Sequence, residues 1–300
     1  MQEIKKYGAI DIGSNAIRLL IANVIISDEK EPQFRKSSLV RVPIRLGADV
    51  FVEEGMIHQD NIQRMIDAIK AFKLLMNVHK VERYKACATS AMREASNGKE
   101  VIDEIFKKTG VQIAMISGKE EAAIISYTDL NELIKGDESY LYVDVGGGST
   151  EFTLFSEGKL ICSKSFKMGT VRLLNNKKTV NKENFAEIEK WIKKKTKDLK
   201  RISLIGSGGN INKLFKMSGR SEGKPISFIY LNAQYQFLKQ MSFEERISEL
   251  RLNADRADVI IPATKIYLSA MKWSGARKIY VPKIGLSDGI IKSLYYNKLS

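Results

Sequence analysis

One pattern occurs twice in the chain and constrains its fold more than any other feature of the sequence. In each copy an apolar strand ends in Asp, an apolar residue, Gly and a turn of small residues, and a second apolar strand follows. The first copy contains Asp11 and the second contains Asp144. This recurrence predicts a duplicated domain of about 140 residues per copy, with the two glycine-containing hairpins facing each other.

The segments between and after the two hairpins alternate between helix and strand patterns. Apolar residues recur at helical spacing over residues 62–75, for example, and a strand pattern follows over residues 84–88. This mixture of helices and strands places the chain in the α/β class. We expect one domain over residues 1–124 and a second over residues 125–300, with the last helix able to pack back on the first domain.

The chain carries a strong excess of positive charge, with 49 Lys and Arg against 35 Asp and Glu. Most of this excess lies between Lys159 and Arg220, where 17 basic residues accompany 4 acidic ones. Runs of like charge usually form solvated helix faces. An excess this concentrated favours a polyanionic partner.

The second hairpin holds the strongest candidate for a functional site. Three consecutive glycines form its turn, namely Gly146, Gly147 and Gly148. Glycine backbones approach an anion closely because no Cβ intervenes, and the Ser149 hydroxyl adds a donor. Asp144 and Glu151 stand at the two ends of this loop, where a hairpin brings them together to hold a hard cation such as Mg²⁺. The plainer alternative, a tight turn with solvated acids, accounts less well for three glycines.

The first hairpin carries the sequence Asp11-Ile12-Gly13-Ser14-Asn15, which is a weaker signal by itself. Ser and Asn are common turn formers beside Gly. Set against the second hairpin, Ser14 and Asn15 would form a second phosphate clamp. Arg18, on the returning strand, is either a phosphate ligand or a surface charge.

Two predicted helix starts carry charged residues of interest. Arg93 lies in the first turns of a helix that begins near residue 89, where the local pattern favours an ordinary helix cap over phosphate binding. Ser117 precedes another helix, whose first turn contains Glu120 and Glu121. Acids suit a helix N-terminus, and this position favours a capping role. One of the two glutamates is alternatively a general base, and the local pattern does not say which, because consecutive helical residues face different sides.

A third glycine-containing loop, Gly206-Ser207-Gly208-Gly209-Asn210, joins a predicted strand to a predicted helix. Gly208 and Gly209 suit an anion or a nucleotide at a helix N-terminus. A simple turn explains the loop equally well, and its spacing is not that of a P-loop or a dinucleotide fingerprint.

Several classes of protein are not expected from this sequence. Charge interrupts every apolar run, so we expect neither a membrane span nor a secretory signal. Cys87 and Cys162 lie in strand patterns and are expected to be inert core thiols, which fits a reducing cytoplasm. His58 and His79 show no metal-ligand spacing.

Six motifs of the chain form a recognisable set. They are Asp11-Ile-Gly-Ser-Asn15, Ala88-Thr-Ser-Ala-Met-Arg93, Ile116-Ser-Gly-Lys-Glu-Glu121-Ala122, Asp144-Val-Gly-Gly-Gly-Ser-Thr-Glu151, Gly169-Thr-Val-Arg172-Leu173 and Gly206-Ser-Gly-Gly209. Together they resemble the Ppx/GppA phosphatase family, the exopolyphosphatases and guanosine pentaphosphate phosphohydrolases of the sugar kinase, Hsp70 and actin superfamily. The resemblance covers essentially the whole chain.

The resemblance implies two ribonuclease-H-like domains of the actin-like ATPase type, with the active site in the cleft between them. It implies that Glu121 is the catalytic base and that Asp144 and Glu151, with Asp11, hold Mg²⁺ or Mn²⁺. The phosphate-binding residues implied are Ser14, Asn15, Arg93, Gly146, Gly147, Gly148, Ser149, Gly208 and Gly209.

The expected activity is Mg²⁺-dependent removal of terminal orthophosphate from inorganic polyphosphate, with guanosine pentaphosphate as an alternative substrate of the same site. A more distant alternative is an ATP-binding assembly protein of the actin or Hsp70 type. A homodimer is compatible with the sequence, whereas neither a membrane nor a nucleic-acid partner is expected. The chain departs from the common family pattern at Asn210, Ala263 and Ser287, outside the proposed catalytic core. These departures bear on how the chain or nucleotide part of a substrate is held.

Overall fold

The computed structural model describes residues 2–28, 30–52, 55–128, 130–134, 138–175 and 178–298. They form two compact units, one of residues 1–128 and 286–300 and the other of residues 129–285. The division follows Thr128, where the sequence suggested a boundary near residue 124. The last helix, α14 (Leu286–Tyr295), belongs to the first unit.

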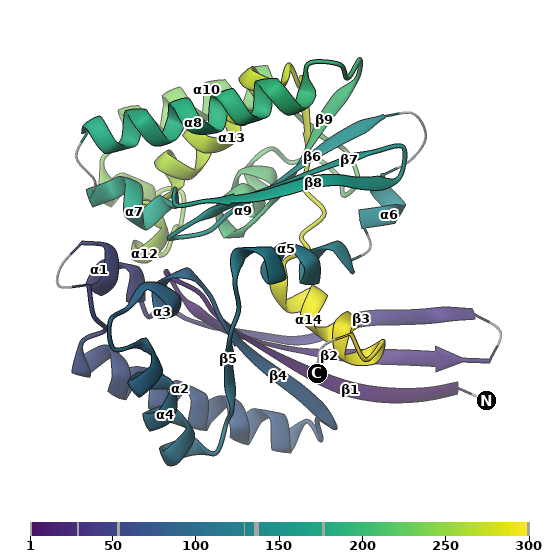
Figure 1. The fold of residues 1–300 in the computed structure, drawn as a ribbon, viewed down its shortest axis with the longest axis vertical. Coiled ribbons are helices and arrows are strands. Elements are labelled where there is room, and N and C mark those ends of the chain that lie inside the picture. The colour runs from purple at the N-terminus through teal and green to yellow at the C-terminus, as the bar shows by residue number, and fades with distance from the viewer. Residues whose placement is uncertain are drawn as a thin grey trace. The chain divides into compact units, whose positions relative to one another are not determined.

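The first unit is built on a mixed sheet, which has five strands among the described residues, in the order β3-β2-β1-β4-β5. The strands are β1 (Gln2–Ile12), β2 (Ile17–Ser27), β3 (Lys30–Val42), β4 (Arg83–Ala88) and β5 (Ile113–Met115). The first three are antiparallel, whereas β4 runs parallel to β1 and β5 parallel to β4. The carboxyl ends of β1, β4 and β5 therefore lie at the same edge of the sheet (Figure 1).

Helices cover both faces of this sheet, because alternate side chains of the central strands are apolar on both sides. The helices are α1 (Leu46–Phe51), α2 (Gln59–Val78), α3 (Ser90–Glu94), α4 (Gly98–Thr109), α5 (Gly118–Ser126) and α14. Ile10 and Ile12 of β1 pack in one apolar cluster with residues of α2 and α4. Tyr7 and Ala9 face the other way and pack with residues of α5 and α14. Asp11 points to this second face, as the alternation of a strand requires.

The second unit contains a mixed sheet of six strands among the described residues, in the order β10-β11-β9-β6-β7-β8. The strands are β6 (Ser139–Val145), β7 (Thr150–Ser156), β8 (Lys159–Phe166), β9 (Ile202–Ser207), β10 (Ile226–Ser227) and β11 (Lys278–Tyr280). The helices are α6 (Leu130–Leu133), α7 (Thr170–Asn175), α8 (Lys178–Thr196), α9 (Gly209–Met217), α10 (Phe228–Gln240), α11 (Phe243–Ser248), α12 (Ala254–Ala257) and α13 (Ile260–Ser274).

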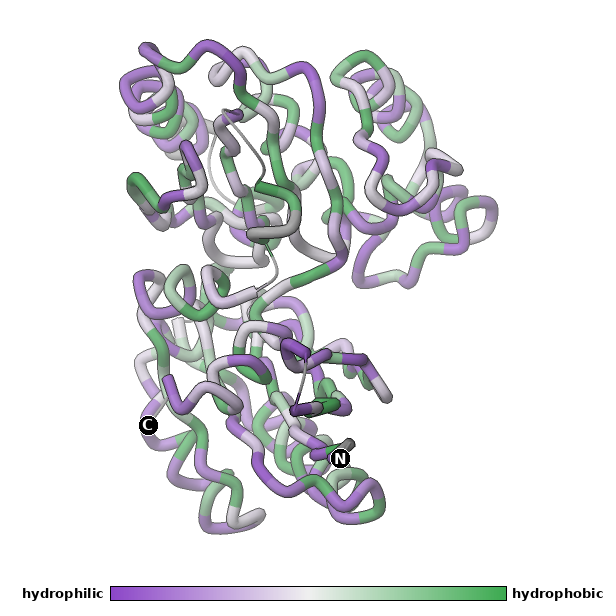
Figure 2. Tube along the Cα trace, turned by 90° about the vertical axis from the view of Figure 1, so that its right-hand side faces the viewer, coloured by the Kyte–Doolittle hydropathy of each residue, from purple (hydrophilic) through white to green (hydrophobic). Residues whose placement is uncertain are grey.

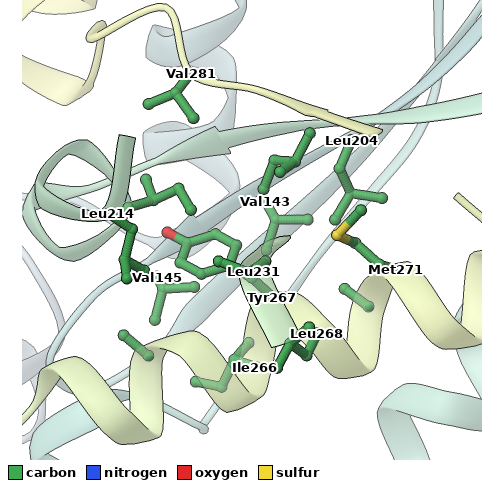
Figure 3. Packing of buried hydrophobic residues seen from close by; sticks show 14 of the residues in the cluster. Val143, Val145, Leu204, Leu214, Leu231, Ile266, Tyr267, Leu268, Met271 and Val281 are labelled. Carbon is green, nitrogen blue, oxygen red and sulfur yellow. The ribbon is translucent and has the colours of Figure 1, made fainter. Parts of the chain in front are cut away.

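The core of the second unit is a single large apolar cluster. Tyr267 of α13 lies among Val143 and Val145 of β6 and Leu214 of α9 (Figure 3). Its hydroxyl donates a hydrogen bond to the carbonyl oxygen of Ser207, at the end of β9. In both units, hydrophobic and hydrophilic residues alternate along the helices, as expected of helices that keep one face on a sheet (Figure 2).

The two units repeat one topology, as the sequence predicts. Strands β8-β7-β6-β9-β11 follow the same order as β3-β2-β1-β4-β5. The first strand of each unit pairs antiparallel with the second and parallel with the fourth. The short β10, which pairs antiparallel with β11, has no counterpart in the first unit among the described residues. The fold is thus a duplicated α/β domain.

Predictions at the sheet edges were partly wrong. The sequence predicts a third strand near residues 39–46, whereas β3 runs over Lys30–Val42 and Leu46 begins α1. Because β3 is an edge strand, its sequence is mostly polar and carries no strong apolar pattern. Cys162 is only half-buried for the same reason, since β8 is the edge strand of the second sheet. Cys87, in the central β4, is fully buried as predicted.

Candidate functional site

The second hairpin places its two acids face to face. Asp144 of β6 and Glu151 of β7 are register partners. Residues directly opposite in an antiparallel pair project to the same side of the sheet, so the two carboxylates share one face. The turn is closed by a hydrogen bond from the Gly146 N–H to the Ser149 carbonyl, 3.0 Å long. This arrangement is the one that the loop sequence predicts.

Hydrogen bonds from the start of α7 fix the backbone orientation of the triglycine loop, Gly146–Gly148. The N–H groups of Thr170 and Val171 donate to the carbonyls of Gly146 and Gly147, both at 2.9 Å. Every described peptide bond is trans, and in a trans peptide the C=O and the following N–H point in opposite directions. The N–H groups that follow these carbonyls therefore point away from α7.

Three successive N–H groups of this loop are available to a ligand. Among the described residues, none accepts a hydrogen bond from the N–H of Gly147, Gly148 or Ser149. A row of such donors without a Cβ to obstruct it forms an anion-binding concavity. The loop is thus built to receive an anion on the side opposite α7.

Glu151 is held by two hydroxyl groups. Its Oε1 accepts hydrogen bonds from the Ser149 hydroxyl at 2.7 Å and the Ser165 hydroxyl at 2.8 Å, and the side chain is 2% exposed. Because the Ser149 hydrogen is directed to Glu151, what Ser149 offers an anion in this structure is its backbone N–H. Ser165, the register partner of Glu151 on β8, is a site residue that the sequence reasoning missed.

The third glycine-containing loop lies beside Asp144. Ser207 of β9 is the register partner of Asp144, and Gly208 follows with a φ of +115°, a conformation that favours glycine. A Cβ at position 208 would lie 3.6 Å from Oδ1 of Asp144 and 3.5 Å from the Tyr267 hydroxyl. Burial, with the negative charge of Asp144, raises the pKa of Tyr267 well above its ordinary value. The protonated hydroxyl therefore stays a donor beneath this loop.

A group of cations surrounds the start of α9, which sequence reasoning did not identify. The guanidinium of Arg256 packs against Gly209. A Cβ at position 209 would lie 3.1 Å from Nη2 of Arg256. Lys213, one turn into α9, donates to the carbonyl of Leu250 at 2.6 Å. Its pKa is lowered by burial and by the positive charges of neighbouring side chains, Lys216, Arg256 and Arg251. A bound anion would relieve this repulsion.

The first hairpin has the geometry of the second with a different pair of side chains. Its turn is closed by the Gly13 N–H and the Ala16 carbonyl, 3.1 Å apart. Asp11 and Arg18 are register partners, as Asp144 and Glu151 are, and Nη1 of Arg18 lies 2.7 Å from Oδ2 of Asp11. The charge of Arg18 is thus paired with Asp11 within the hairpin.

The other residues predicted from the first hairpin differ in their surroundings. The Ser14 hydroxyl lies 2.9 Å from the Ser90 hydroxyl, and both serines are buried. Asn15 follows in the turn, half-buried. The hairpin thus keeps a buried hydroxyl pair next to the Asp11–Arg18 ion pair.

The two glutamates at the start of α5 have separate environments. Glu120 forms a capping box: its Oε2 accepts from the Ser117 N–H at 2.7 Å, and the Ser117 Oγ accepts from the Glu120 N–H at 3.2 Å. These hydrogen bonds lower the pKa of Glu120, which is exposed. Glu121 is buried. The cap and the buried acid, which the sequence could not tell apart, are therefore different residues.

Glu121 shares its neighbourhood with Asp11 and Cys87. Cys87 is the register partner of Asp11 on β4. Burial raises the pKa of Cys87 to about 12, and the negative charges of Asp11 and Glu121 add to this effect, whereas Lys85 opposes it. Arg93 donates from Nη1 to the carbonyl of Ile116 at 2.5 Å. The strand ends of the first unit therefore gather two acids, Asp11 and Glu121, near the buried thiol of Cys87.

The acids of the second hairpin suit a magnesium ion. Among the described residues, no group of three or more His, Cys, Asp and Glu side chains forms a cation site. Mg²⁺ is usually held by one or two carboxylates, with water and substrate phosphates completing its octahedron. Asp144 and Glu151 fit this pattern. Asp11, the third predicted ligand, has its charge paired with Arg18.

Comparisons with known proteins cover nearly the whole chain. The sequence model of the Ppx/GppA phosphatase family matches residues 25–298. A Ppx/GppA family member from Aquifex aeolicus has a solved structure that is 26% identical, with a TM-score of 0.78 over 99% of this chain and 100% of that one. An exopolyphosphatase structure from Cytophaga hutchinsonii, 23% identical, shares the fold with a TM-score of 0.86 over 98% of both chains.

A curated relative from Fusobacterium nucleatum is a bifunctional 3-dehydroquinate synthase/phosphatase. It is 29% identical over 298 residues, which cover 91% of this chain and 44% of that protein. The chain thus spans less than half the length of this relative. In the described part of the chain, no helix is long and apolar enough to cross a membrane.

Proposed function

Because the chain belongs to the Ppx/GppA phosphatase family, we propose that it is an Mg²⁺-dependent exopolyphosphatase that releases terminal orthophosphate from inorganic polyphosphate. Hydrolysis of a phosphoanhydride bond is the reaction of this family. One observation carries the proposal: the carbonyls of the triglycine loop are turned to α7, which leaves three successive N–H groups for the oxygens of a phosphate.

In this proposal Glu121 is the general base. Its carboxylate removes a proton from water, the water oxygen attacks the terminal phosphorus, and the P–O bond to the rest of the chain breaks. The electron pair of that bond stays on the leaving chain, and the product is orthophosphate. The burial of Glu121 and the use of Glu120 as a cap both support this assignment.

The remaining predicted residues bind and stabilise charge. The N–H groups of Gly147, Gly148 and Ser149 donate to the transferred phosphoryl group, where charge develops. Ser14, Asn15, Arg93, Gly208 and Gly209 are proposed to hold further phosphate oxygens. Asp144 and Glu151 would hold Mg²⁺, which supplies charge neutralisation at the phosphate oxygens when bound.

The leaving chain needs cations beyond the catalytic residues. Arg256 and Lys213 supply two of them at the start of α9. Three lysines of α8 (Lys182, Lys190 and Lys193) and Lys197, in the turn that follows it, are exposed at spacings that place them along one side of the helix. A stripe of lysines favours a linear polyanion through release of its counterions. We therefore place the distal part of a long polyphosphate on α8.

The test measures orthophosphate release from long-chain polyphosphate and from guanosine pentaphosphate, each with and without Mg²⁺. We expect kcat/KM for polyphosphate to exceed that for guanosine pentaphosphate, and both activities to vanish when the metal is chelated. A preference for guanosine pentaphosphate would overturn the substrate assignment and leave the site in place. Full activity in a chelator would overturn the metal assignment.

A further inference from the structure

The segment Gly169-Thr170-Val171-Arg172 has no role in the reaction proposed above, although every carbonyl of the triglycine loop accepts a hydrogen bond from it. The Gly146 carbonyl accepts from the Thr170 N–H. The Gly147 carbonyl accepts from the N–H groups of Val171, at 2.9 Å, and Arg172, at 3.2 Å. The Gly148 carbonyl accepts from the side chain, through Nε of Arg172 at 2.9 Å.

We call these hydrogen bonds the brace of the triglycine loop. Its backbone part follows from the start of α7 at Thr170. The first N–H groups of a helix have no acceptor within it, and the loop carbonyls supply acceptors at the start of α7. The approach is so close that a Cβ on Gly169 would overlap the carbonyl group of Gly147 and the nitrogen of Gly148. Gly169 is therefore required for the loop to lie against α7.

The side-chain part of the brace acts on one peptide unit. The Gly148–Ser149 peptide plane turns through ψ of Gly148, where no Cβ resists the rotation, together with φ of Ser149. A reversed Gly148–Ser149 peptide would turn a carbonyl oxygen to the side from which Ser149 now offers its N–H. An acceptor in place of a donor repels a phosphate oxygen.

We propose that Arg172 is a positioning residue, whose bond to the Gly148 carbonyl keeps the Ser149 N–H directed at the phosphate. The proposal rests on the function proposed for the triglycine loop. It assigns Arg172 no contact with substrate.

The first unit supports this reading of Arg172. There the Gly47 N–H, at the start of α1, donates to the Ser14 carbonyl at 2.7 Å, as the Val171 N–H donates to the Gly147 carbonyl. The residue after Gly47 is Ala48, in the place that Arg172 takes after Val171. The backbone brace is thus common to both units, and the side-chain brace accompanies the loop of three glycines.

The test compares Arg172→Ala and Arg172→Lys with Arg246→Ala. Arg246 is a matched control, because its Nε also donates to a backbone carbonyl, that of Ser242 at 3.2 Å, at another short helix of the same unit. Protein labelled with ¹⁵N at glycine and serine is titrated with inorganic phosphate, and the amide signals of Gly147, Gly148 and Ser149 are followed. The kcat and KM for polyphosphate and the midpoint of thermal unfolding are measured in parallel.

We expect phosphate to move the Ser149 amide signal downfield in the wild type and in Arg246→Ala, and to leave it nearly unmoved in Arg172→Ala. The kcat of Arg172→Ala should fall by about 10- to 100-fold, because one donor to the transition state is lost, and Arg172→Lys should recover part of it. An unchanged Ser149 response and kcat in Arg172→Ala, with only a lower unfolding temperature, would overturn the proposal. If phosphate does not shift the amide signals of Gly147, Gly148 and Ser149 in the wild type, the function proposed for the loop is overturned instead.

Discussion

Nη1 of Arg18 lies 2.7 Å from Oδ2 of Asp11, across the same hairpin position at which Glu151 stands opposite Asp144 in the second unit. The duplicated hairpin therefore carries a neutral pair in one unit and two acids in the other. A divalent cation needs anionic oxygen ligands, and an arginine at that position repels it. The two acids make the second hairpin the better candidate for the proposed metal site.

Substitution in the Asp144–Glu151 pair of the second hairpin should weaken activation by the metal. In Glu151→Gln we expect the Mg²⁺ concentration for half-maximal activity to rise about 10- to 100-fold, because one anionic ligand is lost. In Asp11→Asn the rise should be smaller, since Arg18 already neutralises that carboxylate. Mn²⁺ binding followed by electron paramagnetic resonance gives a readout that does not depend on turnover. Equal weakening in the two variants would contradict the assignment.

Glu121→Gln should lose catalysis while keeping substrate affinity. General-base removal typically costs about 10²- to 10⁴-fold, so we expect a fall of that size in kcat with little change in KM. The neighbouring Glu120→Gln is the matched control: glutamine also completes a capping box, so its activity should stay near that of the wild type. Single-turnover phosphate release measures the chemical step directly. A Glu121→Gln enzyme of near-normal rate would remove Glu121 as the base.

The capping box at α5 should give stability that depends on pH. Hydrogen bonds from Ser117 hold the pKa of Glu120 below its ordinary value of 4.5, so the ionised carboxylate is the form that the fold favours. This contribution is complete above the ordinary pKa and is lost as the pH falls through the lowered one. Replacing the cap, in Ser117→Ala, should cost about 1 kcal/mol at pH 7.

Chemical denaturation of wild type and Glu120→Gln at several pH values checks this expectation, because the backbone N–H of Ser117 that lowers the pKa of Glu120 is present in both proteins. The difference in their free energies of unfolding should shrink as the pH falls from about 5 to about 3. A difference that is the same at both ends would show that the ionised Glu120 side chain takes no part in the cap.

Local sequence patterns predicted the duplicated hairpins, the order of most strands and helices, and the capping motif at Ser117. Each of these depends on residues that are close along the chain. What could not be predicted depends on tertiary packing. Arg172 reaches the Gly148 carbonyl and Arg256 reaches Gly209 only after helices from distant parts of the sequence have packed around the sheet. The local pattern likewise left open which of Glu120 and Glu121 is buried, because this depends on how α5 packs.

The lysines of α8, with Lys197 just after it, should bind long polyphosphate and contribute little to the binding of short substrates. Replacing Lys182, Lys190, Lys193 and Lys197 with glutamine should raise the KM for chains of hundreds of phosphates, with little change for tripolyphosphate, because only a long chain reaches beyond the site. The slope of log KM against log salt should fall by about 3, since each phosphate contact accounts for about 0.7. The reading of α8 as an ordinary solvated face predicts no change in either quantity.

A matched control replaces four exposed lysines of the first unit, Lys70, Lys99, Lys107 and Lys108. Each set contains a lysine in an ion pair four residues from its glutamate, namely Lys193 with Glu189 at 2.6 Å and Lys108 with Glu104 at 2.7 Å. Lys197 of the first set also lies 3.7 Å from the exposed Asp198. The two variants carry the same net charge, so a general electrostatic effect would raise both KM values equally. An equal rise in KM in both variants would show that the overall charge of the protein, and not α8, sets the affinity for long polyphosphate. It would contradict the proposal that α8 binds the chain.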